Sequence, residues 1–415
     1  MSIVKPFRGL RPKKELAPQV AAPPYDVLDS DEAREMAKDN PYIFLHVNKP
    51  EIDLDRNINL YNDRVYQRGA DNLKKLISEG IIFQDDKPKF YIYRQIMGDH
   101  QQTGLVAGAS VAEYEKDLIK KHELTRQDKE DDRVKHILYQ NAQAGPVFLT
   151  YRAQNDIDAL ISKITTTQPE YDFTSEDGVK HIVWIVNEDA DIQNIISLFK
   201  KVDFLYVADG HHRSAAAQRV RDAKQKENPK HSGNEEYNYF LTVIFPHNQM
   251  QILDYNRVVK DLNGLNRESF LKKAEEKFEI THLGGSEPFK PQETHQFGMY
   301  LDGSWYKLTA RANSFDAGDP VKRLDVSILQ ENLLAPVLGI GNPRTDKRID
   351  FVGGIRGLKE LEKRVNSGDW AVAFAFFPTS IEELMAIADA GKTMPPKSTW
   401  FEPKLRSGLV VHLLD

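Results

Sequence analysis

A polar turn near the middle of the chain has the residue types that bind phosphate. Its residues are Asp209, Gly210, His211, His212, Arg213 and Ser214. The apolar run 204–208 precedes the turn and an alanine-rich segment follows it, which predicts a strand that enters a helix. Such a junction directs free backbone N–H groups and the positive end of the helix at one point, where an anion can bind. Glycine lets the anion approach the backbone closely, and arginine can bind two of its oxygens.

The same turn has a simpler interpretation as the start of a buried helix. In that case Asp209 caps the helix, and the two histidines only pack against their neighbours. We favour phosphate binding, because adjacent histidines between an aspartate and an arginine are uncommon at an ordinary helix start. The histidines also offer donors whose charge depends on pH.

Two carboxylates are candidates for a catalytic base. Glu123 lies among three basic residues, whose charge favours an ionised carboxylate that can accept a proton from an alcohol or hold a metal. Asp26 follows two prolines and Tyr25 on a stiff segment, which holds a carboxylate in place without a helix. The alternatives are a solvent-facing charged helix around Glu123 and a simple turn in which Tyr25 is packed.

Other side chains are candidates for binding substrate oxygens. Near the C-terminus, two ammonium groups and two hydroxyls lie between prolines, a combination suited to phosphate or carboxylate. The substrate-binding candidates are Tyr25, Arg133, Arg257, Lys397, Ser398, Thr399 and Lys404. For the C-terminal group, an ordinary basic loop that closes the fold is the alternative.

Several known catalytic patterns are excluded. The second histidine of a zinc-protease motif that begins at His122 would fall at position 126, which is an arginine. No P-loop, protein-kinase catalytic loop or G-x-S-x-G elbow is present. Any phosphoryl transfer must therefore use a different fold.

Length and composition limit the class of protein. The 415 residues exceed what one hydrophobic core usually supports, so we expect two domains. Lys+Arg 56 against Asp+Glu 62 gives a net charge of −6, which makes nucleic acid an unlikely partner. The absence of cysteine excludes disulfides and cysteine nucleophiles and favours the cytoplasm. The longest apolar run, 370–377, is far shorter than the ~20 residues of a membrane span, so no membrane anchor is expected.

Strands and helices that could position these residues alternate along the chain. In the first half we expect helices at 32–38 and 60–79, a strand at 42–47 and a hairpin of 91–97 with 104–114. In the second half we expect hairpins of 239–245 with 251–259 and of 297–301 with 306–310, and a buried strand at 370–377. This alternation predicts an α/β fold with a mixed sheet.

Several stretches resemble a known family over nearly the whole chain. They are residues 22–27, 40–42 with 45–47, 122–125 with 132–133, 255–259, and 394–399 with 401 and 403–404. They resemble the family called domain of unknown function 1015. The turn at 209–213 resembles the phosphate-binding turn of the ParB and sulfiredoxin superfamily, whose members bind nucleotides and include free serine kinases.

The resemblance implies a fold and an activity. The expected fold is a ParB/sulfiredoxin-like nucleotide-binding core in residues 1–260, with a C-terminal α/β subdomain in 261–415 that returns to the site. The expected activity is a kinase that transfers phosphate from ATP or ADP, with Mg²⁺, to a small hydroxyl metabolite. Free L-serine, which would give O-phosphoserine, is the leading acceptor.

In that mechanism each candidate residue has a role. Residues 209–214 bind the nucleotide phosphates, and Arg213 also neutralises the charge that develops. Glu123 or Asp26 accepts the hydroxyl proton, while Lys397 and Lys404 steady the phosphate or the substrate carboxylate.

Other functions remain open at this point. One is a nucleotide-binding switch like the ParB-type CTP clamps, and another is a metal-dependent phosphoesterase. An interaction scaffold that binds no nucleotide requires the His-His-Arg turn to be accidental. The expected partners are a nucleotide and a small-molecule substrate, and the oligomeric state stays open, with a homodimer as one candidate.

Overall fold

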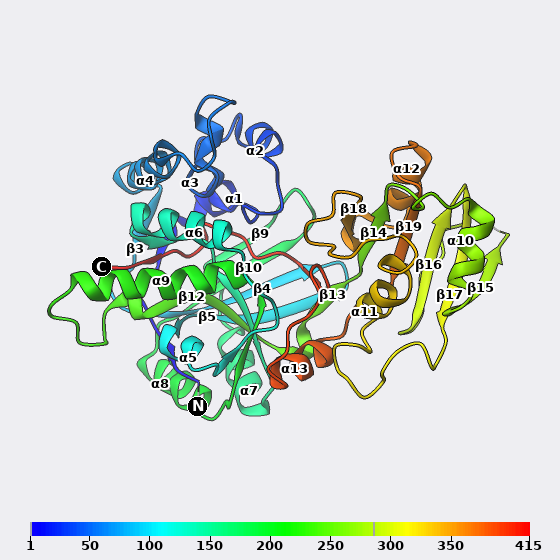
Figure 1. Ribbon diagram of the computed structural model, residues 1–415. Coiled ribbons are helices and arrows are strands. Elements are labelled where there is room, and N and C mark those ends of the chain that lie inside the picture. The colour runs from blue at the N-terminus through cyan, green and yellow to red at the C-terminus, as the bar shows by residue number, and fades with distance from the viewer. Residues whose placement is uncertain (1, 285–286) are drawn as a thin grey trace. The chain divides into compact units, whose positions relative to one another are not determined.

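A computed structural model describes residues 2–284 and 287–415 of the chain (Figure 1). The chain divides into two packed units. The first unit contains Met1–Met250 and Pro403–Asp415, and the second contains Gln251–Glu402. The expected domains 1–260 and 261–415 stay a prediction.

A mixed sheet is the centre of the first unit. In the described residues it has nine strands in the order β6-β11-β8-β12-β5-β4-β10-β9, with β1 paired to β5. The strands are β1 (Val4–Lys5), β4 (Phe90–Met97), β5 (His100–Ser110), β6 (Ile119–Lys120), β8 (Val147–Tyr151), β9 (Tyr171–Thr174), β10 (Lys180–Val186), β11 (Leu205–Asp209) and β12 (Tyr239–Pro246). Two pairs, β6 with β11 and β8 with β12, are parallel and the others antiparallel. The expected α/β fold with a mixed sheet is confirmed.

Helices and two short strand pairs surround this sheet. The helices are α1 (Ala17–Val20), α2 (Ser30–Ala37), α3 (Leu45–Asn48), α4 (Asp63–Ser78), α5 (Val111–Glu115), α6 (Gln127–Gln140), α7 (Asn155–Ile164), α8 (Asp189–Phe199) and α9 (His211–Glu227). The short pairs are β2 (Leu10–Pro12) with β3 (Ile82–Gln84), and β7 (Ala142–Gln143) with β21 (His412–Leu413). Helices α6 and α9 lie side by side (Figure 1), with Ile137, Ala216 and Val220 in one apolar cluster.

Local sequence explains why the predicted helices form. Helix α2 begins with a capping box, in which Asp29 accepts from the backbone of Glu32 and the Glu32 side chain accepts from the backbone of Asp29. Helix α4 is capped by Asn62 and buries one face of its surface, including Leu73. The predictions at 32–38 and 60–79 are confirmed within a few residues, as is the hairpin of β4 and β5.

Two predictions were wrong. The expected strand at 42–47 contains the start of α3 instead, because a short apolar run buried on all sides does not distinguish a strand from a helical turn. The expected hairpin of 239–245 with 251–259 does not form. Strand β12 pairs with β5 and β8 in the first unit, and the chain enters the second unit at Gln251.

The second unit is built on an antiparallel sheet. In the described residues its six strands have the order β15-β17-β16-β19-β14-β18. They are β14 (Tyr255–Val259), β15 (Phe278–Leu283), β16 (Gln296–Leu301), β17 (Ser304–Ala310), β18 (Ile349–Gly353) and β19 (Val372–Phe376), and β13 (Gln251–Leu253) pairs separately with β20 (Trp400–Glu402). The helices are α10 (Arg267–Ala274), α11 (Asp325–Leu329), α12 (Lys359–Asn366) and α13 (Ile381–Asp389). The predicted hairpin at 297–310 and the buried strand at 370–377 are confirmed as β16–β17 and β19.

Within the described residues, no helix is both long and apolar enough to cross a membrane.

Candidate functional site

The start of α9 is shaped by a single glycine between a strand and a helix. Strand β11 ends at Asp209, and Gly210 takes φ +101° before the 17-residue helix begins at His211. This region of φ disfavours every residue with a side chain, which explains the glycine. In the described part of the chain no side chain caps the helix, so Asp209 does not have the capping role of the simpler interpretation. The first-turn amides therefore present an uncapped positive helix end.

Asp209 forms an ion pair instead of capping the helix. Its Oδ2 lies 3.0 Å from Nζ of Lys404, and its Oδ1 lies 3.9 Å from the guanidinium of Arg213. Burial opposes the ionised form, but the charges of Lys404 and Arg213 hold the pKa of Asp209 well below its usual range. This pair keeps Lys404, from the C-terminal segment of the first unit, at the helix start.

Arg213 lies against the turn with unused hydrogen-bonding capacity. Its side chain is 11% exposed and its Nη1 donates to the carbonyl of Pro146. Its Nε is buried and has no hydrogen-bond partner among the described residues. Burial alone would lower the pKa of Arg213, but Asp26 and Asp209 raise it, so the group is a permanent cation. A buried donor without a partner is costly, which favours an acceptor supplied by a ligand.

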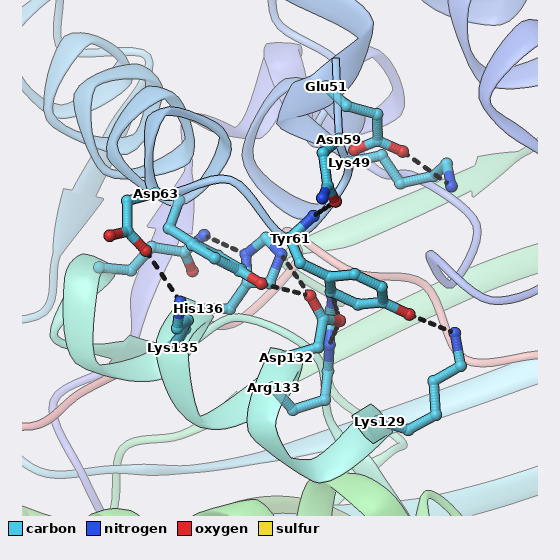
Figure 2. A network of polar contacts seen from close by, with 12 residues as sticks. Lys49, Glu51, Asn59, Tyr61, Asp63, Lys129, Asp132, Arg133, Lys135 and His136 are labelled. Atoms are coloured by element: carbon cyan, nitrogen blue, oxygen red, sulfur yellow. Dashed lines mark hydrogen bonds and ion pairs between the residues drawn. The ribbon is translucent and has the colours of Figure 1, made fainter. Parts of the chain in front are cut away.

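A second guanidinium comes from α6. Arg133 stacks on the ring of Tyr25, with its Cζ 3.7 Å from the ring centroid, and its Nη2 lies 2.5 Å from Oδ2 of Asp132. Asp132 also accepts from the hydroxyl of Tyr66 at 3.0 Å, and His136 lies beside it (Figure 2). Burial raises the pKa of Tyr25 to about 12, although Arg133 opposes this shift, so the ring stays neutral beneath the cation.

Lysines of α6 fix the position of this helix. Nζ of Lys129 donates to the hydroxyl of Tyr61 at 3.2 Å, and Nζ of Lys135 pairs with Asp63 at 2.9 Å (Figure 2). These exposed contacts are weak individually, but they join α6 to Tyr61, just before α4, and to Asp63, the first residue of α4.

The two arginines line one cavity of about 40 Å³, which we call the arginine cavity. Its polar lining includes Tyr25, Asn48, Arg133, His136, Gln140 and Arg213. Asn48 is 6% exposed, and its Nδ2 has no hydrogen-bond partner in the part of the chain that the structure describes. Two cations and unpaired donors, with space for one small group, favour an anionic group in this cavity.

Glu123 and two histidines lie on another side of the helix start. Oε2 of Glu123 lies 3.9 Å from Nδ1 of His211, and the rings of His211 and His122 meet edge to face at 4.4 Å. Burial lowers the pKa of His122 to about 4 and the pKa of His211 well below its usual range. Both rings are therefore neutral at pH 7, so the expected pH-dependent charge does not apply to His211.

Two of the three basic residues near Glu123 in sequence have acidic partners of their own. Lys121 pairs with Asp117 and Arg126 pairs with Asp128. Lys121 and Arg126 are thus partly engaged with other carboxylates.

Asp26 is exposed, and it lies close enough to four groups for its charge to act on them: Tyr25, Arg133, His212 and Arg213. His212 itself accepts a hydrogen bond at Nε2 from the backbone of Arg126, at 3.1 Å. Asp26 is therefore a carboxylate that shares its surroundings with both guanidiniums of the arginine cavity.

Four predicted substrate-binding residues belong to the second unit: Arg257, Lys397, Ser398 and Thr399. Arg257 donates to the carbonyls of Tyr255, Pro396 and Lys397, the last at 2.9 Å. The Ser398 hydroxyl donates to the carbonyl of Pro395 at 2.7 Å. The contacts described for the start of α9 involve none of the four, and their role in substrate binding stays a prediction.

Sequence reasoning did not include Asn48, His136 and Gln140 among the site residues. Asn48 directly follows the stretch 45–47 that carried part of the family resemblance, but its type and spacing gave no sign of a buried unpaired amide. His136 and Gln140 share one face of α6 with Arg133 at intervals of three and four residues, and this spacing could have identified them.

The described residues contain no ready-made metal site. In the described ranges, no three histidine, aspartate or glutamate side chains are grouped to hold a metal ion.

Comparison with known proteins identifies the family. The sequence pattern of the family described as "Protein of unknown function (DUF1015)" matches residues 4–327. The chain belongs to this family. No protein with a curated description matches it.

Solved structures give weaker likenesses to this DUF1015 protein. One is a free serine kinase in complex with AMP, at 12% identity and a TM-score of 0.35, over 72% of this chain and 86% of that chain. A conserved hypothetical protein from Pyrococcus furiosus has 15% identity and a TM-score of 0.35, over 75% and 95%. SbnI from Staphylococcus aureus, truncated at its C-terminus, has 12% identity and a TM-score of 0.33, over 74% and 87%. Likenesses this weak carry no argument, so the ParB/sulfiredoxin-like core stays a prediction.

Proposed function

We propose that this protein is a kinase that binds a nucleotide at the start of α9 and phosphorylates a small hydroxyl-bearing metabolite. The observation that carries the proposal is the arginine cavity beside the uncapped helix start. There, two guanidiniums face a small space together with unpaired donors of Arg213 and Asn48. Helix N-termini bind phosphate, and paired arginines bind phosphate or carboxylate.

The geometry separates two anionic groups. The amides of the first turn of α9, with Gly210 allowing close approach, would bind the nucleotide phosphates. The arginine cavity is small and suits the carboxylate of the acceptor. Arg213 borders both regions, so it would stabilise the charge on the phosphoryl group as that group passes between them.

The acceptor follows from the same features together with the family resemblance. A carboxylate in the arginine cavity and a hydroxyl near the helix start describe a small hydroxy acid. Among such acids the resemblance points to free L-serine, whose phosphorylation would give O-phosphoserine. ATP and ADP are both candidate donors.

In this reaction the serine hydroxyl oxygen bonds to the terminal phosphorus as the bond to the nucleotide oxygen breaks, and the hydroxyl proton passes to a carboxylate. We assign that role to Asp26, because its charge acts on both guanidiniums and on His212. Glu123 is the alternative base, and its Oε2 lies 3.9 Å from Nδ1 of the neutral His211.

Mg²⁺ would accompany the nucleotide. Bound to the phosphates, it supplies charge neutralisation of the transferred group. The carboxylate that does not take the proton could join water in completing its coordination, whereas Asp209 is held by Lys404.

Phosphate transfer by the full chain tests the proposal. Purified protein is mixed with Mg²⁺, ATP or ADP, and L-serine within a panel of small hydroxy metabolites, and new phosphoesters are measured by mass spectrometry. We expect Asp26→Asn to lower kcat by about 100-fold or more, the usual loss of a general base. Glu123→Gln is the matched control, and we expect it to change kcat by less than about tenfold.

Other outcomes have distinct meanings. Nucleotide binding without any phosphoester would favour a regulatory switch, and release of inorganic phosphate alone would favour a phosphoesterase. If Glu123→Gln shows the larger loss, the proton goes to Glu123 and the assignment of Asp26 is wrong.

A further inference from the structure

A second cavity of about 110 Å³ lies in the first unit, and we call it the Arg94 cavity. It shares no lining residue with the arginine cavity. Strand β8 relates the two, since its first residue, Val147, lines the arginine cavity and its last residue, Tyr151, lines the Arg94 cavity. At about 3.3 Å per residue, these two positions are about 13 Å apart along the strand. The Arg94 cavity is thus distinct from the site proposed for phosphate transfer.

Arg94 supplies a cation with free hydrogen-bonding capacity to this cavity. Its Nε donates to the hydroxyl of Thr103 at 2.9 Å, its Nη2 donates to Thr165 at 3.3 Å, and its guanidinium lies over the ring of Trp184. An arginine has five N–H donors, so these two bonds fix its orientation and leave three donors. Among the described residues no carboxylate forms an ion pair with Arg94.

Asp158 supplies the opposite charge. It lies in the first turn of α7 and lines the same cavity. Within the described ranges it has no hydrogen-bond or ion-pair partner, and it is not within ion-pair distance of Arg94. Burial lowers the pKa of Arg94 and raises the pKa of Asp158, so neither charge is compensated by the protein.

The rest of the lining limits the size and character of a ligand. Leu105, Ile157 and Ile244 are apolar members of the lining, whereas Gln101 and Gln249 add polar side chains. The volume has room for several water-sized groups, comparable to a small amino acid.

We propose that the Arg94 cavity is a second binding site for a small dipolar molecule, with a carboxylate on Arg94 and an ammonium on Asp158. The class of ligand is an α-amino acid with a small side chain. This site goes beyond phosphate transfer, because its ligand needs no hydroxyl and contacts no residue of the helix start.

L-Alanine is the probe, because it is dipolar and lacks the hydroxyl that a kinase acceptor needs. Its binding to the full chain is measured by saturation-transfer NMR and titration, beside acetate and methylammonium as single-charge probes. We expect saturable binding of L-alanine, and at least tenfold weaker binding of each single-charge probe. Asp158→Asn keeps the size of the side chain and should weaken L-alanine binding at least tenfold.

Two controls make the result specific. Asp156→Asn changes the same charge on the same helix at an exposed position outside the cavity, and should leave L-alanine binding within twofold. Arg213→Ala reports on binding at the arginine cavity, and it should also leave L-alanine binding unchanged. Circular dichroism at each titration condition verifies that Asp158→Asn is folded.

The proposal is wrong if L-alanine does not bind, if Asp158→Asn binds it as well as the original chain does, or if acetate alone binds as tightly. Loss of L-alanine binding in Arg213→Ala but not in Asp158→Asn would place the ligand at the arginine cavity. That result would overturn the second site and leave the proposed kinase intact.

Discussion

Arg213 in the first unit and Arg257 in the second are both largely buried cations, and both were expected to bind anions. Their hydrogen bonds differ. Arg257 donates to three backbone carbonyls and lies over the rings of Phe351 and Phe376. Arg213 donates to one carbonyl, and its Nε has no partner among the described residues.

The difference shows that charge and burial do not by themselves identify an anion site. Three of the five N–H donors of Arg257 bind backbone carbonyls, and two of these bonds hold the 396–397 segment against β14. Arg213 keeps a donor for a ligand and shares its cavity with Arg133. The count of unused donors is therefore the property that separates a binding arginine from a structural one.

Replacing Arg213 should lower activity, whereas replacing Arg257 should lower stability. The loss of activity is the largest effect we expect. Arg213→Ala should lower phosphoryl transfer by about 100-fold or more, since it removes charge stabilisation at the transferred group. Arg257→Met should leave transfer within about twofold while destabilising the second unit by about 2–3 kcal/mol, because carbonyls lose their buried donors. Transfer assays and urea denaturation of both variants measure these effects. A large loss of phosphoryl transfer in Arg257→Met without destabilisation would show that Arg257 is not a structural residue.

The stabilities of the two units should also change with pH in opposite directions. In the second unit, burial raises the pKa of Asp325 to about 8, although the backbone of His295 donates to it. The folded state then holds a proton that the unfolded chain releases, so stability falls as pH rises between 4 and 8. In the first unit, burial lowers the pKa of His122 to about 4, so stability falls as pH drops from 6.5 towards 4.

From pH 5 to pH 7 these shifts correspond to a loss of about 3 kcal/mol at Asp325 and a gain of about 2 kcal/mol at His122. Hydrogen exchange of amides in β19 and β8, corrected for the intrinsic effect of pH, measures the two units separately. Asp325→Asn should remove the loss of stability measured in β19 between pH 5 and pH 7. His122→Gln should reduce the gain in β8 but not abolish it, because burial also lowers the pKa of His181, to about 3. Exchange that changes in the same direction in both units would contradict this expectation.

The sequence predicted local features of the site better than its long-range contacts. The turn at 209–213 follows from residue types within one segment, and the strand, glycine and helix occur there as expected. Lys404 reaches the turn through an ion pair between residues 195 apart, which only the family resemblance suggested. The misread hairpin at 239–259 failed for the same reason, since the partners of β12 are decided by a sheet assembled from distant strands.

The separation of Lys404 from residues 397–399 could not be predicted, although they are close in sequence. The boundary between the units falls at 402/403, and no change of composition marks it. Asn48 was missed because an unpaired amide is a property of its surroundings. Residue type thus indicated which chemistry is available, while packing decided which residues come together in one site.

The smallest predicted effect concerns the glycine that positions Arg213. A β-carbon at Gly210 would lie 3.1 Å from Nε of Arg213, and its φ of +101° already disfavours alanine. Gly178, with φ +79° and no atom within 4 Å of such a carbon, is the matched control. Both alanine variants should lose about 1 kcal/mol of stability, because both adopt a backbone conformation that alanine avoids.

Only Gly210→Ala should also weaken nucleotide binding, by about tenfold, because its methyl group displaces the guanidinium and blocks close approach of phosphate. Calorimetric titration with ATP or ADP measures the affinity, and urea denaturation measures the stability of each variant. Equal affinities for Gly210→Ala and Gly178→Ala would mean that Arg213 does not contact the phosphates. In that case the unused donor of Arg213 serves only the arginine cavity, and the nucleotide is held by the helix start alone.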